Sequence, residues 1–312
     1  MFYPFLFEQN LTQNYLWGGQ RLRKLSYQAP IGEPIAEAWL ISDRPEDDRV
    51  SVIRNGQHQG KSLRWLIERH AKEILGFNTK KFPVLIKILD AQQRLSLQVH
   101  PPKQVADRLK GESKNECWYF LPETNSGSKI FAGFSKKLTV QEFEHYAVNG
   151  TIEPFLGQLD ATPGKLVYLP SGRLHAIDAG CFILEIQQNS NTTYRIHDWN
   201  RTDPKTGRRR DLHIKESLIA TRLNDLNPQY ETKRGKLILS SPDFSIEENF
   251  GNSQLQANLG EIIIAVDKPI ELSWTNGKLN LNRLDPALIP SQTKYQISSS
   301  PTNKWLRIRL AV

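Results

Sequence analysis

Two patterns are missing from the sequence: a dense set of cysteines and a long apolar run. Among 312 residues the only cysteines are Cys117 and Cys181, and both lie in apolar, aromatic surroundings. Small secreted proteins that depend on disulfides carry a denser, even-numbered set. The number of cysteines alone does not exclude a pair, but reduced and buried thiols are the expected state.

Nowhere does the sequence approach the roughly eighteen consecutive apolar residues of a membrane-spanning helix. The first residues contain Glu8 and lack the basic segment and small-residue cleavage site of a signal peptide. These absences predict a cytoplasmic protein without a membrane partner.

Concentrated charge is missing as well. The formal net charge is +8, from 41 lysines and arginines against 33 aspartates and glutamates, but the basic residues are spread along the chain. They do not form an arm interleaved with aromatic residues, and the densest run, at 205–211, is short and loop-like. The excess suits an acidic small ligand, and nucleic acid is not a favoured partner.

Short strand-like segments dominate what is present. They lie at 84–89, 95–100, 117–121, 166–169 and 181–187. Helical periodicity is confined to 62–75, 103–110, 139–149 and 213–224, and the first of these opens with Ser62 as an N-cap. The pattern predicts a mainly β fold, a barrel or sandwich, into which the helices are inserted.

The texture of the sequence changes after Arg234. Apolar segments separated by Pro, Gly, Asn and Ser predict a second set of short antiparallel strands there. All seven histidines and both cysteines precede this point, so the C-terminal part has no histidine or cysteine to bind a metal. We expect a catalytic domain at 1–234 and a smaller, metal-free β domain at 235–312.

Three segments of the first part carry candidate metal ligands. In the strand LSLQVH, Gln98 and His100 are two residues apart and point to the same face. Glu116 precedes an apolar strand and would be costly to bury unless it were paired, protonated or bound to a cation. His175 opens a strand after a turn whose Pro170 and Gly172 set its direction.

Two imidazoles, one carboxylate and one amide oxygen form a mixed nitrogen and oxygen set. Such a set suits zinc and is also compatible with manganese, iron or cobalt. The ligands alone therefore predict a divalent metal site without deciding which metal it holds.

At these residues the chain resembles the type I phosphomannose isomerases, zinc-dependent enzymes of the cupin superfamily that interconvert mannose 6-phosphate and fructose 6-phosphate. The matching segments are YLWGG at 15–19, AEAWLIS at 36–42, FPVLIKILDAQQRLSLQVHP at 82–101, KNECWYF at 114–120, YLPSGRLHAI at 168–177 and EIQQNSNTTYRIHDWNR at 185–201. The length and the DLHI segment at 211–214 look like the short bacterial form. The resemblance implies a cupin jelly-roll barrel.

The resemblance also implies roles for single residues. Gln98, His100, Glu116 and His175 match the zinc ligands, and Arg195, in the segment TTYR, matches an active-site arginine. Lys114 and Glu185 match further pocket positions. Asn191 departs from the pattern, because relatives commonly carry an aspartate there, so a proton-transfer role for that carboxylate does not apply to this chain.

An aldose–ketose isomerisation through an enediol needs a base near C1 and C2 and stabilisation of negative charge on O1 or O2. Glu185 is the base that we expect, because its strand is otherwise apolar and burial raises a carboxyl pKa. The alternative is a buried structural ion pair between Glu185 and Arg195. Arg208, Arg209 and Arg210 are either a phosphate cradle or a solvated basic loop.

The remaining histidines lack the spacing of ligands. We expect His197 and His213 to support the site by hydrogen bonds or to lie at the surface, and His58, His70 and His145 to be surface residues. Two other functions stay open at this stage. One is a non-catalytic sugar-binding cupin, and the other is an iron-dependent oxygenase, which uses two histidines and a carboxylate. The sequence does not indicate an oligomeric state, and a monomer is compatible with it.

Overall fold

The structure is a computed structural model that describes residues 2–9, 12–13, 15–25, 32–202 and 207–311. Its contacts divide the chain into two compact units. Unit 1 comprises residues 1–11, 38–87 and 231–312, and unit 2 comprises residues 12–37 and 88–230. The expected domains at 1–234 and 235–312 stay a prediction.

Unit 2 is built around antiparallel strands that face one another. One sheet has the strand order β10 (Leu156–Asp160), β9 (Lys129–Phe134), β12 (His175–Ile177), β7 (Leu97–Val99) and β14 (Tyr194–His197). The facing strands are β11 (Leu166–Leu169), β8 (Glu116–Phe120) and β13 (Phe182–Gln188), in that order. Both sets contribute side chains to one apolar cluster, so the core of unit 2 lies between them.

The pleat of β8 shows how sequence places side chains in this core. Trp118 and Phe120 belong to the apolar cluster, together with Ile130 and Ala132 from the other sheet. Successive residues of a strand point to opposite faces, so Glu116 points to the same side as Trp118 and Phe120. The interior is therefore apolar over most of its depth and becomes polar where Glu116 enters it.

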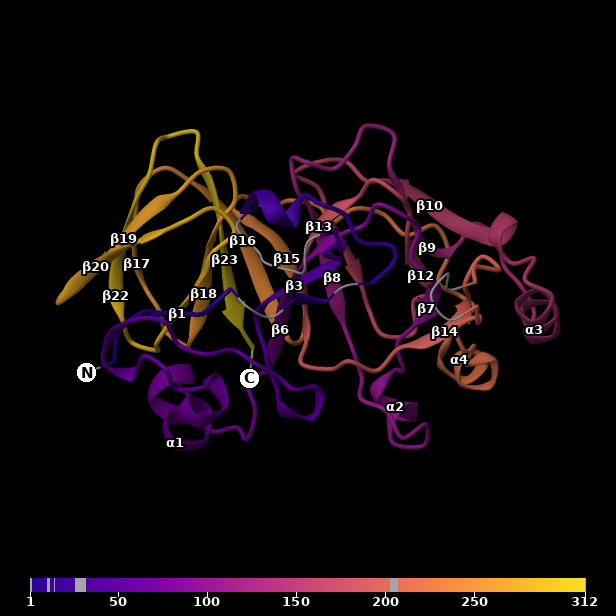
Figure 1. Cartoon of the computed structure of the whole chain (residues 1–312), viewed down its shortest axis with the longest axis horizontal. Helices are drawn as coiled ribbons and strands as arrows, with labels where there is room; N and C mark the ends of the chain where they lie inside the picture. Colours follow the sequence, from indigo (N-terminus) through magenta and orange to yellow (C-terminus); the bar gives the residue numbers. More distant parts are fainter. Residues whose placement is uncertain (1, 10–11, 14, 26–31, 203–206, 312) are drawn as a thin grey trace. The chain divides into compact units, whose positions relative to one another are not determined.

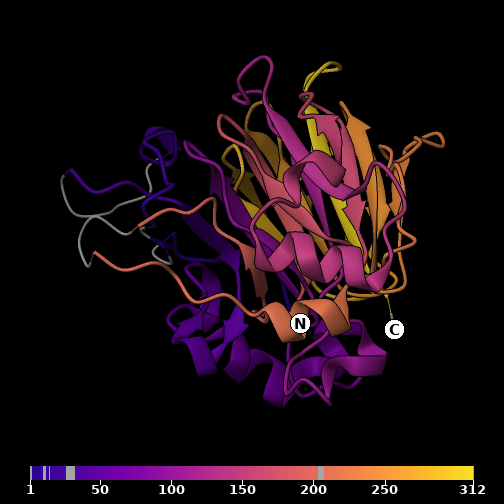
Figure 2. The same cartoon turned by 90° about the vertical axis from the view of Figure 1, so that its right-hand side faces the viewer.

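Helices cover the other face of the β7 sheet. The outward residues of that sheet, such as Leu97, Val99 and Phe131, form a second apolar cluster with residues of α3 (Val140–Val148) and α4 (Ile214–Ala220). In the view of Figure 2 these helices lie in front of the sheet, and Figure 1 labels them. A capping box between Thr139 and Glu142 starts α3.

Unit 1 contains a second sandwich. One sheet has the strand order β1 (Phe5–Leu6), β21 (Pro286–Ile289), β18 (Glu261–Ala265), β23 (Lys304–Leu310), β16 (Phe244–Phe250) and β15 (Leu237–Ser240). The other has the order β17 (Ser253–Gln256), β22 (Lys294–Ser298), β19 (Ile270–Trp274) and β20 (Gly277–Leu281). Their inward side chains, among them Ile263, Leu272 and Trp305, pack into a common core.

The remaining elements lie outside these sets of strands. They are β2 (Thr12–Gln13), η1 (Leu22–Leu25), β3 (Glu37–Ile41), β4 (Asp43–Arg44), η2 (Pro45–Asp47), β5 (Arg49–Val50), η3 (Gly56–His58), α1 (Leu63–Leu75), β6 (Val84–Asp90), α2 (Lys103–Ala106) and η4 (Glu153–Phe155). The Ser62 side chain accepts a hydrogen bond from the backbone N–H of Trp65, which confirms the predicted cap of α1.

The prediction of a mainly β fold with few helices is confirmed. Two helices are shorter than predicted: 103–110 forms a helix only at Lys103–Ala106, and 213–224 only at Ile214–Ala220. Cys117 and Cys181 are buried and free, as predicted, and burial raises the pKa of Cys181 to about 12. Over the described residues, no helix is long and apolar enough to cross a membrane.

Candidate metal centre

Strand register brings distant residues into one row on the inner face of the β7 sheet. His175 on β12 lies directly opposite Gln98 on β7, and Arg195 on β14 lies opposite Gln98 on the other side. Directly opposed residues of antiparallel strands share a face, so the three side chains lie next to one another. In the facing sheet, Glu116 lies opposite Gln187 and Trp118 lies opposite Glu185.

His100, Glu116 and His175 form a compact buried cluster. The Nε2 atoms of His100 and His175 each lie 3.4 Å from a carboxylate oxygen of Glu116. All three residues have at most 1% of their surface exposed, and their ligand atoms lie within 4.8 Å of one another. The Gln98 amide joins them, because its Nε2 lies 3.2 Å from His175 Nε2. The structure thus brings the four predicted ligands together.

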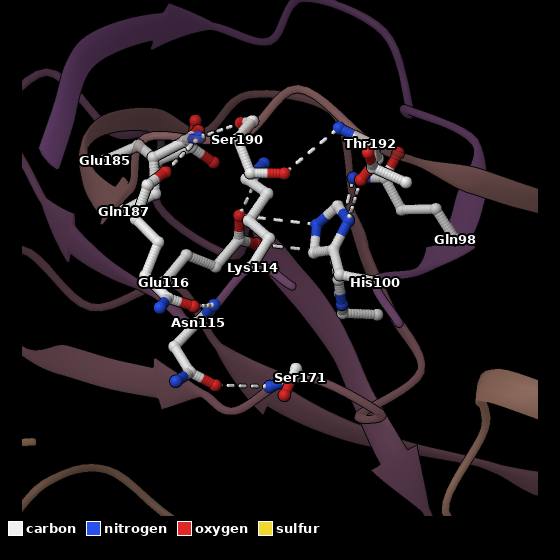
Figure 3. A network of polar contacts seen from close by, with 12 residues as sticks. Gln98, His100, Lys114, Asn115, Glu116, Ser171, Glu185, Gln187, Ser190 and Thr192 are labelled. Carbon is white, nitrogen blue, oxygen red and sulfur yellow. Dashed lines mark hydrogen bonds and ion pairs between the residues drawn. The ribbon is translucent and has the colours of Figure 1, made fainter. Parts of the chain in front are cut away.

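Backbone carbonyls fix the orientation of both imidazoles. His100 Nδ1 lies 2.8 Å from the carbonyl oxygen of Thr192, and His175 Nδ1 lies 2.8 Å from that of Arg173. A carbonyl only accepts hydrogen bonds, so each Nδ1 carries the proton and each Nε2 presents a lone pair to the cluster. Figure 3 shows His100 between Thr192 and Glu116. Carbonyl partners of this kind hold histidine ligands in metal sites.

The protonation states of the cluster suit a cation. Burial lowers the pKa of His175 to about 3 and also lowers the pKa of His100. Burial alone would raise the pKa of Glu116, but the positive charge of Lys114 outweighs it and holds the pKa well below its ordinary value. Neutral imidazoles beside an ionised carboxylate are the ligand forms that a metal ion requires.

Three atoms of the cluster lack a hydrogen-bond partner. Among the residues that the structure describes, His100 Nε2 and both carboxylate oxygens of Glu116 are fully buried without one, although Oε2 makes an ion pair with Lys114. Buried polar atoms without partners are costly, and they are commonly completed by a ligand or an ion. These orphan atoms, together with the donor set, fit a divalent metal ion bound by Gln98, His100, Glu116 and His175.

Lys114 places a positive charge beside the cluster. Its Nζ lies 2.8 Å from Glu116 Oε2, and the residue is only 5% exposed. Burial on its own would lower the pKa of Lys114, but the charges of Glu116 and Glu185 outweigh it, so the pKa is raised from its ordinary value. The ammonium group therefore stays charged within reach of both carboxylates.

Glu185 lies in the interior of unit 2, on the face that carries Trp118. The Trp118 indole Nε1–H donates a 3.0 Å hydrogen bond to Glu185 Oε1, and both side chains are buried. The alternative of an ion pair with Arg195 is not supported: among the described residues, Arg195 makes no ion pair with Glu185, and its Nη1 donates instead to the Asp211 carbonyl at 2.9 Å. The Nε of Arg195 is buried and has no partner in the part of the chain that the structure describes.

The basic segment at 205–211 is only partly described, since residues 203–206 lie outside the described residues. Arg210 makes an ion pair with Asp198, with 2.8 Å between Nε and Oδ2, and Arg201 pairs with the same carboxylate. Arg208 and Arg209 are exposed. The pKa of Arg195 is lowered. Burial is the largest cause, and the positive charges of Arg210 and Arg201 add to it.

The other histidines do not join the cluster. His213 accepts a 3.1 Å hydrogen bond from the backbone N–H of Arg195 through Nδ1, which ties β14 to the start of α4. His197 is buried against Trp199, with 5.0 Å between their ring centroids. His58 and His70, which were expected at the surface, are partly exposed and pack against aromatic rings that include Trp65. His145 is exposed, and so is Asn191.

Reading the sequence alone missed the residues that hold the candidate site in shape. Trp118 stands in the run CWYF, which is typical of an ordinary buried strand. Thr192 and Arg173 act through their carbonyl oxygens, which every residue has. A single sequence carries no signal for such contacts, because they depend on strand register and backbone direction.

Comparison with known proteins identifies the family. Residues 6–126 match the family model described as "Phosphomannose isomerase type I, catalytic domain". A mannose-6-phosphate isomerase of Streptococcus mutans is 36% identical over 273 residues, which cover 84% of this chain and 84% of that protein. The chain belongs to the type I phosphomannose isomerase family. The resemblance seen in the sequence is thereby confirmed.

Solved structures agree with the family at the level of the fold. A mannose 6-phosphate isomerase from Bacillus subtilis superimposes with a TM-score of 0.87, at 27% identity, over 98% of this chain and 99% of that one. A zinc-bound mannose 6-phosphate isomerase is 17% identical, with a TM-score of 0.79 over 99% of this chain and 100% of that one. The cupin fold that the family resemblance predicted for this chain is therefore confirmed.

Proposed function

We propose that this protein is a metal-dependent aldose–ketose isomerase that interconverts D-mannose 6-phosphate and D-fructose 6-phosphate through a cis-enediol. Membership of the phosphomannose isomerase family supports the substrate and the reaction. The observation that carries the proposal is the buried cluster of His100, Glu116 and His175, with Lys114 beside it. A structural core would not bury so many ionisable groups together without a ligand.

The metal is zinc, and Gln98, His100, Glu116 and His175 would hold it, Gln98 through its amide oxygen after the amide group, whose nitrogen faces His175, is turned over. When bound, the ion acts as a Lewis acid toward negative charge on sugar oxygens. Two neutral nitrogens and oxygen ligands suit zinc, although other divalent ions accept the same set. The low pKa of His175, about 3, means that the imidazole need not lose a proton at neutral pH before it binds the ion.

Glu185 is the base that moves the proton. Its carboxylate takes the proton from C2 of the open-chain aldose, the electrons form the C1–C2 double bond of the cis-enediol, and the same carboxyl group returns the proton to C1. The O2 hydroxyl loses its proton as the ketone forms, and O1 gains one. A single buried carboxylate serves both carbons, because C1 and C2 are adjacent and can be reached from the same side of a planar cis-enediol.

Two cations stabilise the negative charge that develops on O1 and O2. Lys114 is buried and charged beside Glu116, and Arg195 lies on the same inner row as Gln98 and His175. The Arg195 Nε is buried without a partner among the described residues, so it has a donor left for a sugar oxygen. The phosphate needs a further cationic partner. Candidates among the described residues are Arg210 and Arg201, whose charges act on Arg195 and which both pair with the carboxylate of Asp198.

The two alternatives have less support. An iron-dependent oxygenase would use two histidines and a carboxylate but has no need of Gln98, Lys114 and Arg195 around them. A sugar-binding module without turnover would not need a buried base such as Glu185. The expected partner is a sugar phosphate. The cytoplasmic location and the absence of nucleic acid and membrane partners stay predictions, and no oligomeric state is assigned.

One assay tests the proposal directly. The zinc-loaded protein is incubated with mannose 6-phosphate, and the appearance of fructose 6-phosphate is followed. We expect turnover that a chelator abolishes and added metal restores. His175→Ala should lose both bound metal and turnover, whereas His145→Ala, at an exposed helical position, should keep both. Absence of isomerisation with zinc, manganese, iron and cobalt in turn would reject the proposed function.

Glu185→Gln tests the base separately from the metal. The amide keeps the size of the side chain but cannot accept a proton, so kcat should fall by about 10²- to 10⁴-fold. Zinc content, measured by atomic absorption, should stay at the wild-type level because Glu185 is not among the ligands. Near-normal kcat with full zinc content would assign the base to another residue.

A further inference from the structure

Trp118 connects two functional side chains across the interior of unit 2. It is 1% exposed, and its Nε1–H donates to Glu185 Oε1 at 3.0 Å. The two residues lie directly opposite each other on the paired strands β8 and β13, so the strand pairing keeps their side chains close together. The indole ring also meets the His175 ring edge to face, with 5.4 Å between centroids and 82° between planes.

The acceptor of this indole distinguishes it from other tryptophans in the chain. Trp199 donates to the carbonyl oxygen of Leu95, and Trp305 donates to that of Gly251. Those bonds only satisfy a buried N–H group. Trp118 instead donates to a carboxylate, and a hydrogen bond to an ionised acceptor is stronger than one between neutral groups.

Packing alone does not require a tryptophan at this position. Phenylalanine would fill much of the same space in the apolar cluster, and it would bring no buried donor that needs a partner. The indole N–H is useful only if the carboxylate that it meets must be held. The indole N–H holds one oxygen of the Glu185 carboxylate, and proton transfer depends on the orientation of that carboxylate.

We propose that Trp118 is a positioning residue that holds the Glu185 carboxylate through its indole N–H and keeps it in fixed relation to the His175 ring. This inference rests on the proposed function, in which Glu185 is the base. Trp118 itself does not touch the substrate in this scheme. Its effect on the rate passes through Glu185.

The test is the variant Trp118→Phe, assayed with zinc and mannose 6-phosphate. We expect kcat to fall by about 10- to 100-fold, because a misplaced base loses rate, while KM stays within about threefold of wild type. Zinc content should remain at the wild-type level. The matched control is Trp305→Phe, which removes a buried indole hydrogen bond in unit 1 and should leave kcat unchanged.

A double-mutant cycle separates positioning from general loosening of the core. If Trp118 acts through Glu185, then Trp118→Phe should change the residual kcat of Glu185→Gln by less than about twofold. An equal fractional loss in both backgrounds would overturn the proposal, and so would loss of zinc from Trp118→Phe or a wild-type kcat in that variant. If the wild-type protein isomerises the substrate and Trp118→Phe has the same kcat, this inference is rejected and the proposed function stands.

A second measurement does not depend on activity or on the stability of Trp118→Phe. The indole N–H resonances of the ¹⁵N-labelled chain are recorded for wild type and for Glu185→Gln. The bond to a carboxylate should give one strongly downfield indole proton, and this proton should move upfield when the acceptor becomes a neutral amide. Identical indole spectra in the two proteins would show that no indole donates to Glu185 and would overturn the proposal.

Discussion

At the residue scale, the chemistry of the candidate site is set by what each side chain is buried against. The four predicted ligands could be found from the sequence, because their types and spacings are unusual in apolar strands. Their protonation states could not be found there. The Thr192 and Arg173 carbonyls decide which nitrogen of His100 and His175 faces the cluster, and neither contact leaves a trace in the residue types.

His197 offers a prediction about pH at the same scale. Burial is the largest influence on its pKa, which is lowered from the ordinary value of 6.5. Below pH 6.5 the unfolded chain therefore binds a proton that the folded chain does not, so the contribution of His197 to stability is lost as the pH falls through this range. One proton corresponds to a loss of at most about 1.4 kcal/mol per pH unit.

The measurement is urea unfolding at pH 7.5 and pH 5.5. Wild type should lose more unfolding free energy between these pH values than His197→Gln does, by on the order of 1 kcal/mol. The glutamine variant loses packing against Trp199, so the comparison uses the change with pH and not the absolute stability. His145→Gln, exposed on α3, is the control and should follow wild type. A pH dependence of His197→Gln equal to that of wild type would contradict the assignment.

At the element scale, the sequence predicted where the helices begin better than where they end. Ser62 marks the start of α1 because a cap is a local interaction. α2 ends at Ala106, and the turn that follows it contains a left-handed Lys110, with φ of 52°; apolar spacing indicates neither feature. The strand register could not be predicted either, because no local sequence pattern indicates that Gln98 pairs with His175 on one side and with Arg195 on the other.

Gly172 is the element-scale position on which the metal centre depends most. Its φ is +90°, and its backbone N–H donates to the His100 carbonyl oxygen at 2.8 Å, which ties the end of β7 to the turn before β12. A Cβ here would lie 2.8 Å from the Arg222 side chain. Gly172→Ala should therefore lower the unfolding free energy by about 1–3 kcal/mol and weaken zinc binding as His175 is displaced.

The matched variant is Gly127→Ala. Gly127 has φ of +79° and open space around its Cβ position, so it reports the backbone cost alone. We expect a smaller loss of stability and unchanged zinc affinity, both measured by calorimetry. If Gly172→Ala bound zinc as tightly as Gly127→Ala, the turn at Gly172 would not be responsible for the orientation of His175.

At the scale of the whole molecule, the chain forms two compact units whose membership is non-local. The change of texture near residue 234 is visible in the sequence because it is a local property. That residues 1–11 and 38–87 join residues 231–312 in unit 1 depends on contacts between segments far apart in the chain. The metal centre draws its ligands from three separate segments, all within unit 2, so the ion would link β7, β8 and β12.

Zinc should therefore stabilise the folded chain in a concentration-dependent way. The unfolded chain has no preformed cluster, so binding favours the folded state, by about 2.7 kcal/mol when free zinc is about 100 times its Kd. Thermal unfolding of the metal-free protein, titrated with zinc, measures the shift. His175→Ala should show little shift, and His145→Ala should show the full one. Hydrogen exchange should slow at β7, β8 and β12 on binding, because these strands carry the ligands. A zinc-dependent shift that survives in His175→Ala would mean that the ion binds elsewhere.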